Sequence, residues 1–425
     1  MLKYKRSLCA TLFLLFVSGI ILAQNNTNSY YSRYGYGELS DFSSGRSRSM
    51  GGVSTGMRSG NEINTANPAS YTAIDSLTFL FEFGVSAKQY IFESAGAKSK
   101  TFTGNIEYLA MQFPLSRRLA VSAGLLPFSN VGYSFTTQGS ASMPTYAGNN
   151  DQVDYMTGYT GSGNITQAYL GLSGKIGEHF AVGINASYLF GTITNSRALA
   201  FMPNRATNDS LKSYASTLQD TRLRVQDLRL RYGVQYFTDL GETDRFTAGL
   251  IFENKTKLDG DYTIETQGED TISTNAGDNF ELPLLIGVGA SYQWKNRLTV
   301  AADFMYQDWA NVNYFGRKDT LRSRSKFSLG AEFIPNRNAK NYFSRVAYRI
   351  GGNYSSGYVN VNNRTEGSFG LTCGLGLPMR RSTLNVGFEY GRRGSTAVGQ
   401  IREDYFRFNL SAAFNEMWFF KRRFD

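Results

Sequence analysis

The chain has 425 residues, a formal net charge of +10, and only one His and two Cys. These counts exclude a His/Cys metal cluster and a disulfide framework, and catalysis by a Ser-His-Asp triad would depend on His179 alone. Aromatic residues make up 14% of the chain, and 44 Gly stand against 8 Pro. We therefore expect one large β structure with no cofactor, no metal and no enzymatic activity.

The first 23 residues have the pattern of a secretory signal peptide. Lys3, Lys5 and Arg6 form a positive start, residues 8–22 are almost all apolar, and Ala23 precedes a polar run. The apolar stretch is too short for a transmembrane helix. We expect cleavage after Ala23 and an exported chain.

Apolar and polar residues alternate in about fourteen segments after residue 75. In the segment 282–294, one face is apolar with an aromatic end and the other holds Gly, Ser and Gln. This two-residue period is typical of a transmembrane β-barrel, although a soluble β-sandwich also shows it. The connections favour the barrel, because tight turns alternate with long polar segments at 130–163, 193–221 and 256–279. The sequence predicts an all-β fold, a transmembrane antiparallel β-barrel of about fourteen strands over residues 76–425 with long extracellular loops.

Basic residues gather at the tight turns. They include Arg117, Arg118, Lys295, Arg297, Arg337, Lys340, Arg380 and Arg381. We interpret them as contacts with the anionic headgroups of outer-membrane lipid and lipopolysaccharide. Nucleic-acid binding is disfavoured because the chain is exported and lacks a module that combines basic and aromatic residues.

Residues 24–75 do not alternate, and their Gly-rich composition suits a compact segment inside the barrel lumen. A basic run of small residues leads into Met50-Gly51-Gly52, and Asn67-Pro68-Ala69 stands just before the first expected strand. These motifs resemble the N-terminal hatch of the FadL-like outer-membrane transporters, fourteen-stranded barrels plugged by their own N-terminus. That family usually continues with Gly and an apolar residue, where Ser70-Tyr71 follow here. The resemblance implies a hatch at 24–75 that uses Arg46, Arg48, Met50, Gly51, Gly52, Asn67, Pro68 and Ala69.

Charged residues fall on the expected lumen face of several strands. They are Glu82, Arg229, Arg231, Asp303, Glu332, Arg349, Glu389 and Arg407. Paired carboxylates can serve acid/base catalysis, but we interpret these charges as pairing with one another and with the hatch. No catalytic residue is expected.

Two expected strands depart from regular alternation. Leu223 and Val225 give way to Leu228 and Leu230, which predicts a β-bulge near 226–227. Pro127 interrupts another strand directly after Leu126, either because the strand ends there or because the wall has a local gap. In the resembled family, a kink in the third strand opens a lateral exit, so Leu126 and Pro127 would mark such an opening.

Two functions of different classes remain open. The first is passive uptake of a hydrophobic or amphipathic small molecule through the outer membrane of a Gram-negative bacterium. Capture residues would then lie in a long external loop, since Met and Tyr adapt to apolar shapes: Met143, Tyr146, Tyr155, Met156 and Tyr159. The second is a non-transporting barrel that joins protein partners in an outer-membrane secretion or assembly complex.

Overall fold

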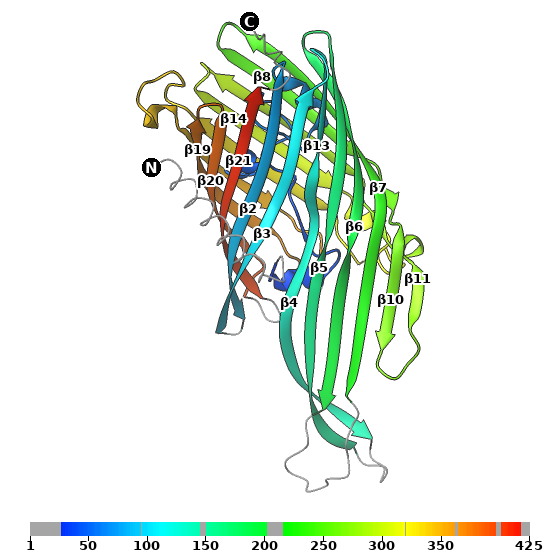
Figure 1. Cartoon of the computed structure of the whole chain (residues 1–425). Coiled ribbons are helices and arrows are strands. Elements are labelled where there is room, and N and C mark those ends of the chain that lie inside the picture. The colour runs from blue at the N-terminus through cyan, green and yellow to red at the C-terminus, as the bar shows by residue number, and fades with distance from the viewer. Residues whose placement is uncertain are drawn as a thin grey trace, which may run out of the picture.

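The computed structural model describes residues 27–94, 96–144, 150–201, 216–318, 320–361, 364–396 and 401–417. Within these ranges, fourteen strands form one closed antiparallel barrel, which confirms the predicted fold class (Figure 1). In chain order they are β2 (Thr78–Ser94), β3 (Ala97–Pro114), β4 (Leu119–Pro144), β5 (Asn150–Ile176), β6 (Phe180–Phe201), β7 (Thr217–Leu240), β8 (Asp244–Glu253), β13 (Leu285–Trp294), β14 (Leu298–Gln307), β15 (Arg324–Phe333), β16 (Ala347–Ser355), β19 (Ser368–Met379), β20 (Ser382–Arg393) and β21 (Arg402–Met417). Each pairs with the next, and β2 pairs with β21 to close the wall.

Short elements lie inside the barrel and in its connections. They are η1 (Tyr30–Arg33), β1 (Glu38–Leu39), α2 (Gly45–Arg48), η2 (Pro68–Ala73), β9 (Thr256–Lys257), β10 (Gly260–Thr266), β11 (Ile272–Asn275), η3 (Ala276–Asp278), β12 (Glu281–Leu282), η4 (Trp309–Asn311), η5 (Phe343–Arg345), β17 (Asn360–Val361) and β18 (Arg364–Thr365). No helix in the described ranges is long and apolar enough to cross a membrane. The predicted signal peptide, residues 1–23, lies outside the described residues.

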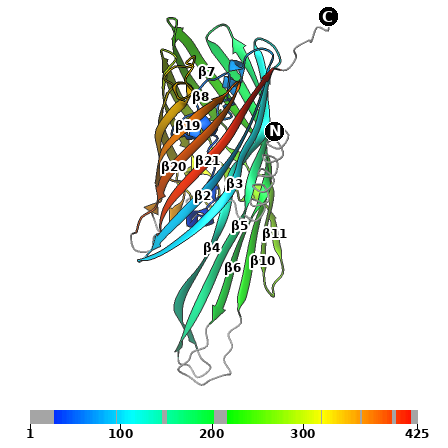
Figure 2. The same ribbon diagram turned by 60° about the vertical axis from the view of Figure 1, so that its left-hand side comes forward.

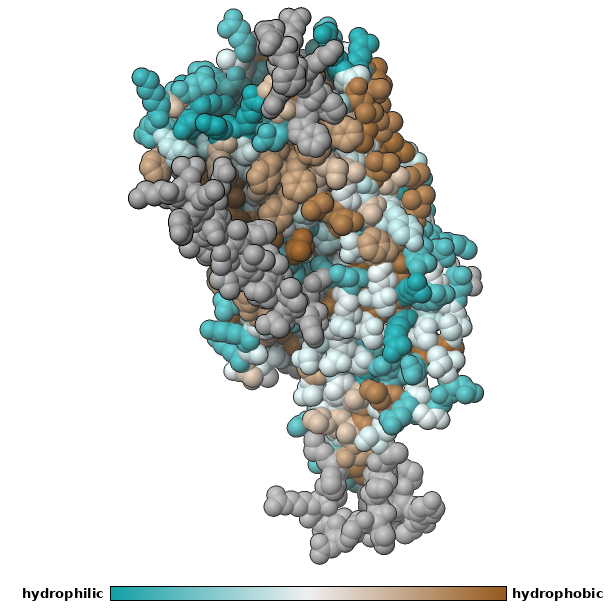
Figure 3. Space-filling view, viewed as in Figure 1, coloured by the Kyte–Doolittle hydropathy of each residue, from teal (hydrophilic) through white to brown (hydrophobic). Residues whose placement is uncertain are grey.

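Apolar side chains form a band on the outer face of the barrel. Val288 on β13 pairs with Phe304 on β14, which pairs with Phe327 on β15. Val288 and Phe327 are both exposed. Figure 3 shows apolar residues gathered on the upper half of the visible face, while the projecting lower part is mostly neutral or hydrophilic. A band of limited height is typical of a barrel that faces lipid over only part of its length.

The strands β4, β5 and β6 extend well below the lower ends of β2 and β3 (Figures 1 and 2). β4 and β5 pair as far as Pro144 and Asn150, and β6 and β7 pair as far as Leu199 and Thr217. The prediction of a long loop was therefore wrong for most of 130–163. In the segment 193–221 it was wrong for 193–201 and 217–221, which are strand, while 202–215 lie outside the described residues. Strands that leave the lipid need no apolar outer face, so their alternation is lost from the sequence.

The predicted bulge in β7 is absent, because β6 and β7 pair without a register shift through Gln226 and Asp227. Leu223 and Val225 are buried, whereas Leu228 is exposed. The apolar residues change faces where the strand leaves the lipid band. Below the band they pack inward, and within it they point outward.

An aromatic cluster packs in the interior on the side where β4–β7 project. Tyr36 is fully buried, and its ring lies 5.5 Å from that of Trp309 and 6.5 Å from that of Phe280. The Tyr36 hydroxyl donates to the carbonyl oxygen of Glu281 at 2.9 Å. Connections between strands supply Trp309, Phe280 and Tyr358, which packs on Trp309. This cluster joins the hatch to the strand connections on that side of the barrel.

Candidate functional site

The hatch, defined here as residues 27–75, lies inside the barrel and touches the wall backbone directly. Gly51 has a φ of +72°, and a Cβ at this position would lie 2.5 Å from the carbonyl oxygen of Gly352 on β16. The Gly51 N–H donates to the Thr372 hydroxyl on β19 at 2.8 Å. On the opposite wall, a Cβ at Gly183 on β6 would lie 2.5 Å from the carbonyl carbon of Pro68. Glycine at these contacts lets two backbones meet with no side chain between them.

The Asn67-Pro68-Ala69 motif starts η2 and fixes it to the wall. The Asn67 Oδ1 accepts from the Ala69 N–H at 3.1 Å, and Pro68 occupies the first turn, where its missing donor is not needed. The Asn67 Nδ2 donates to the carbonyl oxygens of Thr55, in the hatch, and Val234, on β7, at 2.8 and 3.3 Å. Asn67 therefore joins two parts of the hatch to the wall.

Of the remaining predicted hatch residues, Met50 is fully buried and packs in a cluster with Val53, Met57 and Ala301 of β14. Gly52 has a φ of +85°, which only glycine adopts easily. The Arg48 guanidinium lies 2.7 Å from the Glu107 carboxylate on β3. Each of these residues therefore lies within the hatch or at its contact with the wall.

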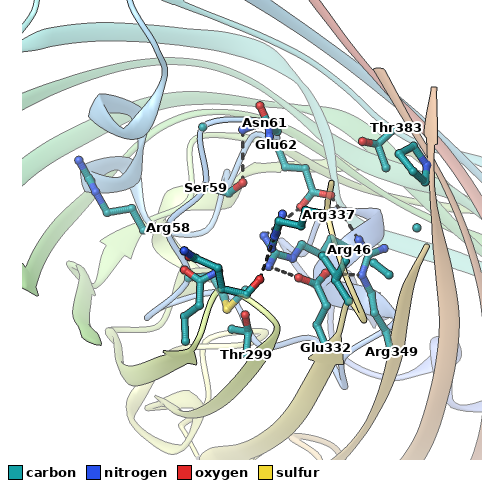
Figure 4. Close-up of a pocket in the computed structure, with 18 of the residues that line it drawn as sticks. Arg46, Arg58, Ser59, Asn61, Glu62, Thr299, Glu332, Arg337, Arg349 and Thr383 are labelled. Carbon is teal, nitrogen blue, oxygen red and sulfur yellow. Dashed lines mark hydrogen bonds and ion pairs between the residues drawn. The ribbon is translucent and has the colours of Figure 1, made fainter. Parts of the chain in front are cut away.

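Near the end with tight turns, four charged groups form a closed network (Figure 4). The Glu332 carboxylate on β15 lies 2.6 Å from the Arg46 guanidinium and 2.7 Å from that of Arg349 on β16. Glu62 of the hatch lies 3.6 Å from Arg46 and 3.7 Å from Arg349. The side chains are almost completely buried, so their pairing offsets the desolvation of the individual charges.

Other predicted lumen charges are also buried against partners. Arg229 and Arg231 on β7 share Glu253 on β8, with Arg229 at 2.7 Å, and Arg231 stacks 3.8 Å above the ring of Phe42 in the hatch. The Asp303 carboxylate on β14 accepts from the backbone N–H groups of hatch residues Ser54 and Thr55 at 2.6 and 2.7 Å. Arg407 pairs with Glu389 at 3.1 Å. Glu82 is buried and has no salt bridge among the described residues.

The wall has an opening between β3 and β4. Their pairing runs only from Pro114–Ala120 to Leu109–Leu125, beyond which β3 pairs with β2 alone. Pro127 does not end β4, which continues to Pro144 with a register shift after Pro127. On the edge of β4 left free by β3, β1 of the hatch pairs with Ser129 and Asn130. Leu126 and Pro127 line the opening.

A chamber of about 520 Å³ lies behind this opening, and it is strongly charged. Three of its ion pairs link the hatch to the wall: Lys88–Glu38 and Arg48–Glu107, each at 2.7 Å, and Lys326–Asp41 at 2.8 Å. Burial alone would raise the pKa of Asp41, but Lys326 and Arg324 outweigh this effect and hold it well below its usual range. The chamber is therefore suited to polar groups more than to apolar ligands.

The described residues among those predicted to capture a ligand are in strands and not in an open loop. Tyr155, Met156 and Tyr159 belong to β5, where neighbouring residues such as Tyr155 and Met156 point to opposite faces. Tyr159 stacks 5.2 Å from Phe135, with the hatch guanidinium of Arg33 3.9 Å from its ring. Tyr146 and the side chain of Met143 lie outside the described residues. Among the described members, Tyr155 and Met156 thus do not share one surface.

His179 is exposed in the turn before β6, where its Nδ1 lies 3.1 Å from the carbonyl oxygen of Phe237. No group of three or more His, Cys, Asp or Glu in the described part of the chain has the arrangement of a metal site.

The sequence reasoning missed several partners of the lumen charges. Glu253 shares its face with Ile251 in the expected strand, so the alternation could have identified it. Glu107 could not be found in this way, because β2 and β3 pair with a bulge that buries both Glu107 and Tyr108. Glu62 lies in the hatch, where apolar and polar residues do not alternate, so the sequence does not show which way its side chain points.

Comparison with known proteins assigns a family and a fold. The BamG family model matches residues 3–425, almost the whole chain. The chain belongs to the BamG family. Among curated proteins, none matches this BamG-family chain in sequence.

Solved structures similar to this BamG-family barrel come from another group. The toluene transporter TbuX of Ralstonia pickettii is 16% identical with a TM-score of 0.57, over 89% of this chain and 99% of its own. A FadL homologue from Pseudomonas aeruginosa is 13% identical with a TM-score of 0.57 and the same coverage. The Pseudomonas putida toluene transporter TodX is 16% identical with a TM-score of 0.56, over 90% of this chain and 100% of its own. Because the identities are this low, the similarity to the FadL-type structures concerns only the fold, which is a β-barrel of the outer-membrane type.

Proposed function

We propose that this protein is a non-transporting barrel subunit of a complex that assembles proteins in the outer membrane of a Gram-negative bacterium. Membership in the BamG family supports a place beside the BAM assembly machinery. The FadL-like transporters that the chain resembles also have a hatch, so the observation that carries the proposal is the charged chamber on the route from the β3–β4 opening. The hatch meets the wall through backbone contacts at Gly51 and Gly183 and through the network around Glu332.

The two ends of the interior support the same proposal. Apolar ligands bind best in pockets with mainly apolar walls, whereas the chamber behind the β3–β4 opening contains at least three ion pairs. The aromatic cluster around Tyr36 packs the hatch against the wall on the side where β4–β7 project. A barrel closed in this way can serve as a rigid membrane scaffold without conducting solutes.

A channel for small hydrophobic molecules is the second candidate. The observation in its favour is the opening between β3 and β4, lined by Leu125, Leu126 and Pro127. A ligand on this route would have to cross the charged chamber, which is why we favour the subunit.

Purification from native membranes in a mild detergent separates the two candidates. A subunit should elute with protein partners in a fixed stoichiometry, as measured by mass spectrometry of the intact assembly. Elution as a single chain with bound fatty acid or another apolar compound would reject the subunit and favour the channel.

Labelling of intact cells tests the proposed orientation. In a Cys373→Ser background, a membrane-impermeant maleimide should label Thr160→Cys, which lies exposed on the projecting part of β5. It should not label Glu178→Cys, in the tight turn between β5 and β6, unless the cells are lysed. The reverse pattern would place the tight turns outside the cell.

A further inference from the structure

A basin of about 550 Å³ opens at the end of the barrel that carries the tight turns (Figure 4). Its walls are formed by hatch residues and by side chains on the inner face of the strands near the tight turns. Two carboxylates, Glu62 and Glu332, and eight arginines line it, a formal surplus of six positive charges: Arg46, Arg58, Arg245, Arg337, Arg345, Arg349, Arg380 and Arg381. We call this cavity the arginine basin.

Five of these eight arginines form no ion pair with a described residue. One of the five, Arg58, donates instead to the carbonyl oxygen of Ala69 at 3.1 Å. Arg46 and Arg349 belong to the buried network, and Arg245 pairs with Asp239 at 2.6 Å. In the described part of the chain, no ion pair is formed by Arg337 and Arg345, from the β15–β16 connection, or by Arg380 and Arg381, from the β19–β20 turn. The Arg345 Nε is buried without a hydrogen-bond partner in the same part of the chain.

The excess of positive charge affects the arginines themselves. Burial and the nearby Arg245 lower the pKa of Arg58 to about 10. Burial also lowers the pKa of Arg337. Glu332 and Glu62 act against this effect, whereas the like charges of Arg46 and Arg349 add to it. Bound carboxylates would relieve this repulsion and satisfy the unused N–H groups.

The position of the basin favours a protein segment over a lipid as its occupant. Its wall includes Thr247, Ser291 and Thr299, polar side chains buried on the inner face of β8, β13 and β14. The basin therefore opens along the barrel axis, away from the lipid-facing surface, and headgroups in the plane of the membrane do not meet it. Its volume lies in the range of about 300–1,000 Å³ that holds small ligands or part of a peptide.

We propose that the arginine basin binds an acidic peptide segment of a periplasmic partner protein. This proposal rests on the proposed role as a complex subunit. The planar guanidinium groups of Arg337, Arg380 and Arg381 can each hold a carboxylate through two parallel hydrogen bonds. These arginines come from two neighbouring connections of the rim, because β16 pairs directly with β19, so an extended acidic segment that follows the rim can contact both.

Binding of a fluorescent octaglutamate peptide to the full chain in detergent tests the proposal by fluorescence anisotropy. The basin variant carries Arg337→Gln, Arg380→Gln and Arg381→Gln. The control variant carries Arg117→Gln, Arg118→Gln and Arg297→Gln, which remove the same charge from exposed turn residues that do not line the basin. We expect the basin variant to bind about tenfold more weakly, about 1.4 kcal/mol, and the control variant to bind like the wild type. Heat-modifiable migration in gels checks that both variants are folded.

Three outcomes would overturn the acidic-peptide proposal. Equal weakening by the two variants would show attraction by net charge alone. Equal binding of octaglutamine would exclude recognition of carboxylates. Competition by inorganic phosphate as strong, per charge, as that of octaglutamate would indicate a general anion site.

Co-elution with protein partners tests the proposed subunit role separately from peptide binding by the basin. If the basin variant loses octaglutamate but still elutes with all partners, the basin does not hold the complex together, and the subunit role stands. If the wild type elutes without partners yet binds octaglutamate through the basin, the site stands and the subunit role fails.

Discussion

The Nη2 atom of Arg46 in the hatch lies 2.6 Å from the Oε1 atom of Glu332 on β15, and both side chains are almost completely buried. Glu332 also holds Arg349 on β16 at 2.7 Å. One carboxylate therefore neutralises a guanidinium from the hatch and another from the wall, which couples the position of the hatch to the integrity of the barrel.

Replacing Glu332 by Gln should destabilise the protein by about 3–5 kcal/mol, because it leaves two buried guanidinium groups with Glu62 as their only carboxylate. Unfolding in urea of the protein refolded in detergent measures the effect. Glu269→Gln, at an exposed turn between β10 and β11, is the matched control and should stay within about 0.5 kcal/mol of wild type. Equal losses would contradict a structural role of the network.

Two glycines with positive φ test the fit of the hatch. A Cβ at Gly51 would meet backbone at 2.5 Å, whereas one at Gly268 would meet nothing within 4 Å. Gly268→Ala should cost about 1 kcal/mol of backbone strain, and Gly51→Ala should add an overpacking cost of roughly 1–3 kcal/mol. Since the hatch must shift, Gly51→Ala should also raise conductance in planar bilayers. Unchanged conductance would mean that the hatch does not seal the lumen at this point.

Arg at position 288 tests the lipid-facing band. Val288 is 44% exposed on the outer face of β13, so Val288→Arg should destabilise the protein by about 2–4 kcal/mol if this position lies near the membrane midplane. Thr160→Arg, on the projecting part of β5, should be close to neutral. Chemical unfolding in lipid vesicles measures both, and a neutral Val288→Arg would place β13 outside the hydrocarbon.

Asp41 should make the stability of the hatch depend on pH. Lys326, at 2.8 Å, holds its pKa below the usual value despite burial. A lowered pKa stabilises the folded protein above the unfolded value of about 3.9, and this contribution is lost as pH falls toward the folded value. The difference in melting temperature between wild type and Asp41→Asn should thus be constant from about pH 8 to 5 and shrink below about pH 4. A difference that grows on acidification would contradict the assigned ion pair.

The barrel could be predicted because its signal is local. Within the lipid band, strands such as 285–294 must alternate, and each carries that pattern without reference to its neighbours. The expected start of this strand at 282 was wrong, because Leu282 belongs to β12 and is buried in the interior. Where strands leave the lipid, apolar and polar residues no longer need to alternate. The sequence therefore predicts β4–β7 to be shorter than they are. The apolar residues move from the inner to the outer face between Val225 and Leu228, because the strand enters the lipid band there. In the sequence this shift looks like a β-bulge.

The arginine basin could not be predicted from the sequence. Arg337, Arg380 and Arg381 were predicted to contact headgroups, because a turn has no period that tells which way its side chains point. The structure shows that they line the basin. Their neighbours in space, Arg46 and Arg58, lie about three hundred residues away in the chain, and only the closed barrel brings them together.

The pairing of β2 with β21 also constrains the order of assembly. The hatch and β2 leave the ribosome first and β21 last, so the final seam joins strands separated by most of the chain. Contacts so distant in sequence form slowly, since the intervening loop must close first. The hatch and the wall meet backbone to backbone at Gly51 and Gly183, so we expect the hatch to be in place before the seam closes. We expect a chain truncated before β21 to expose the hatch to protease, whereas the complete chain protects it.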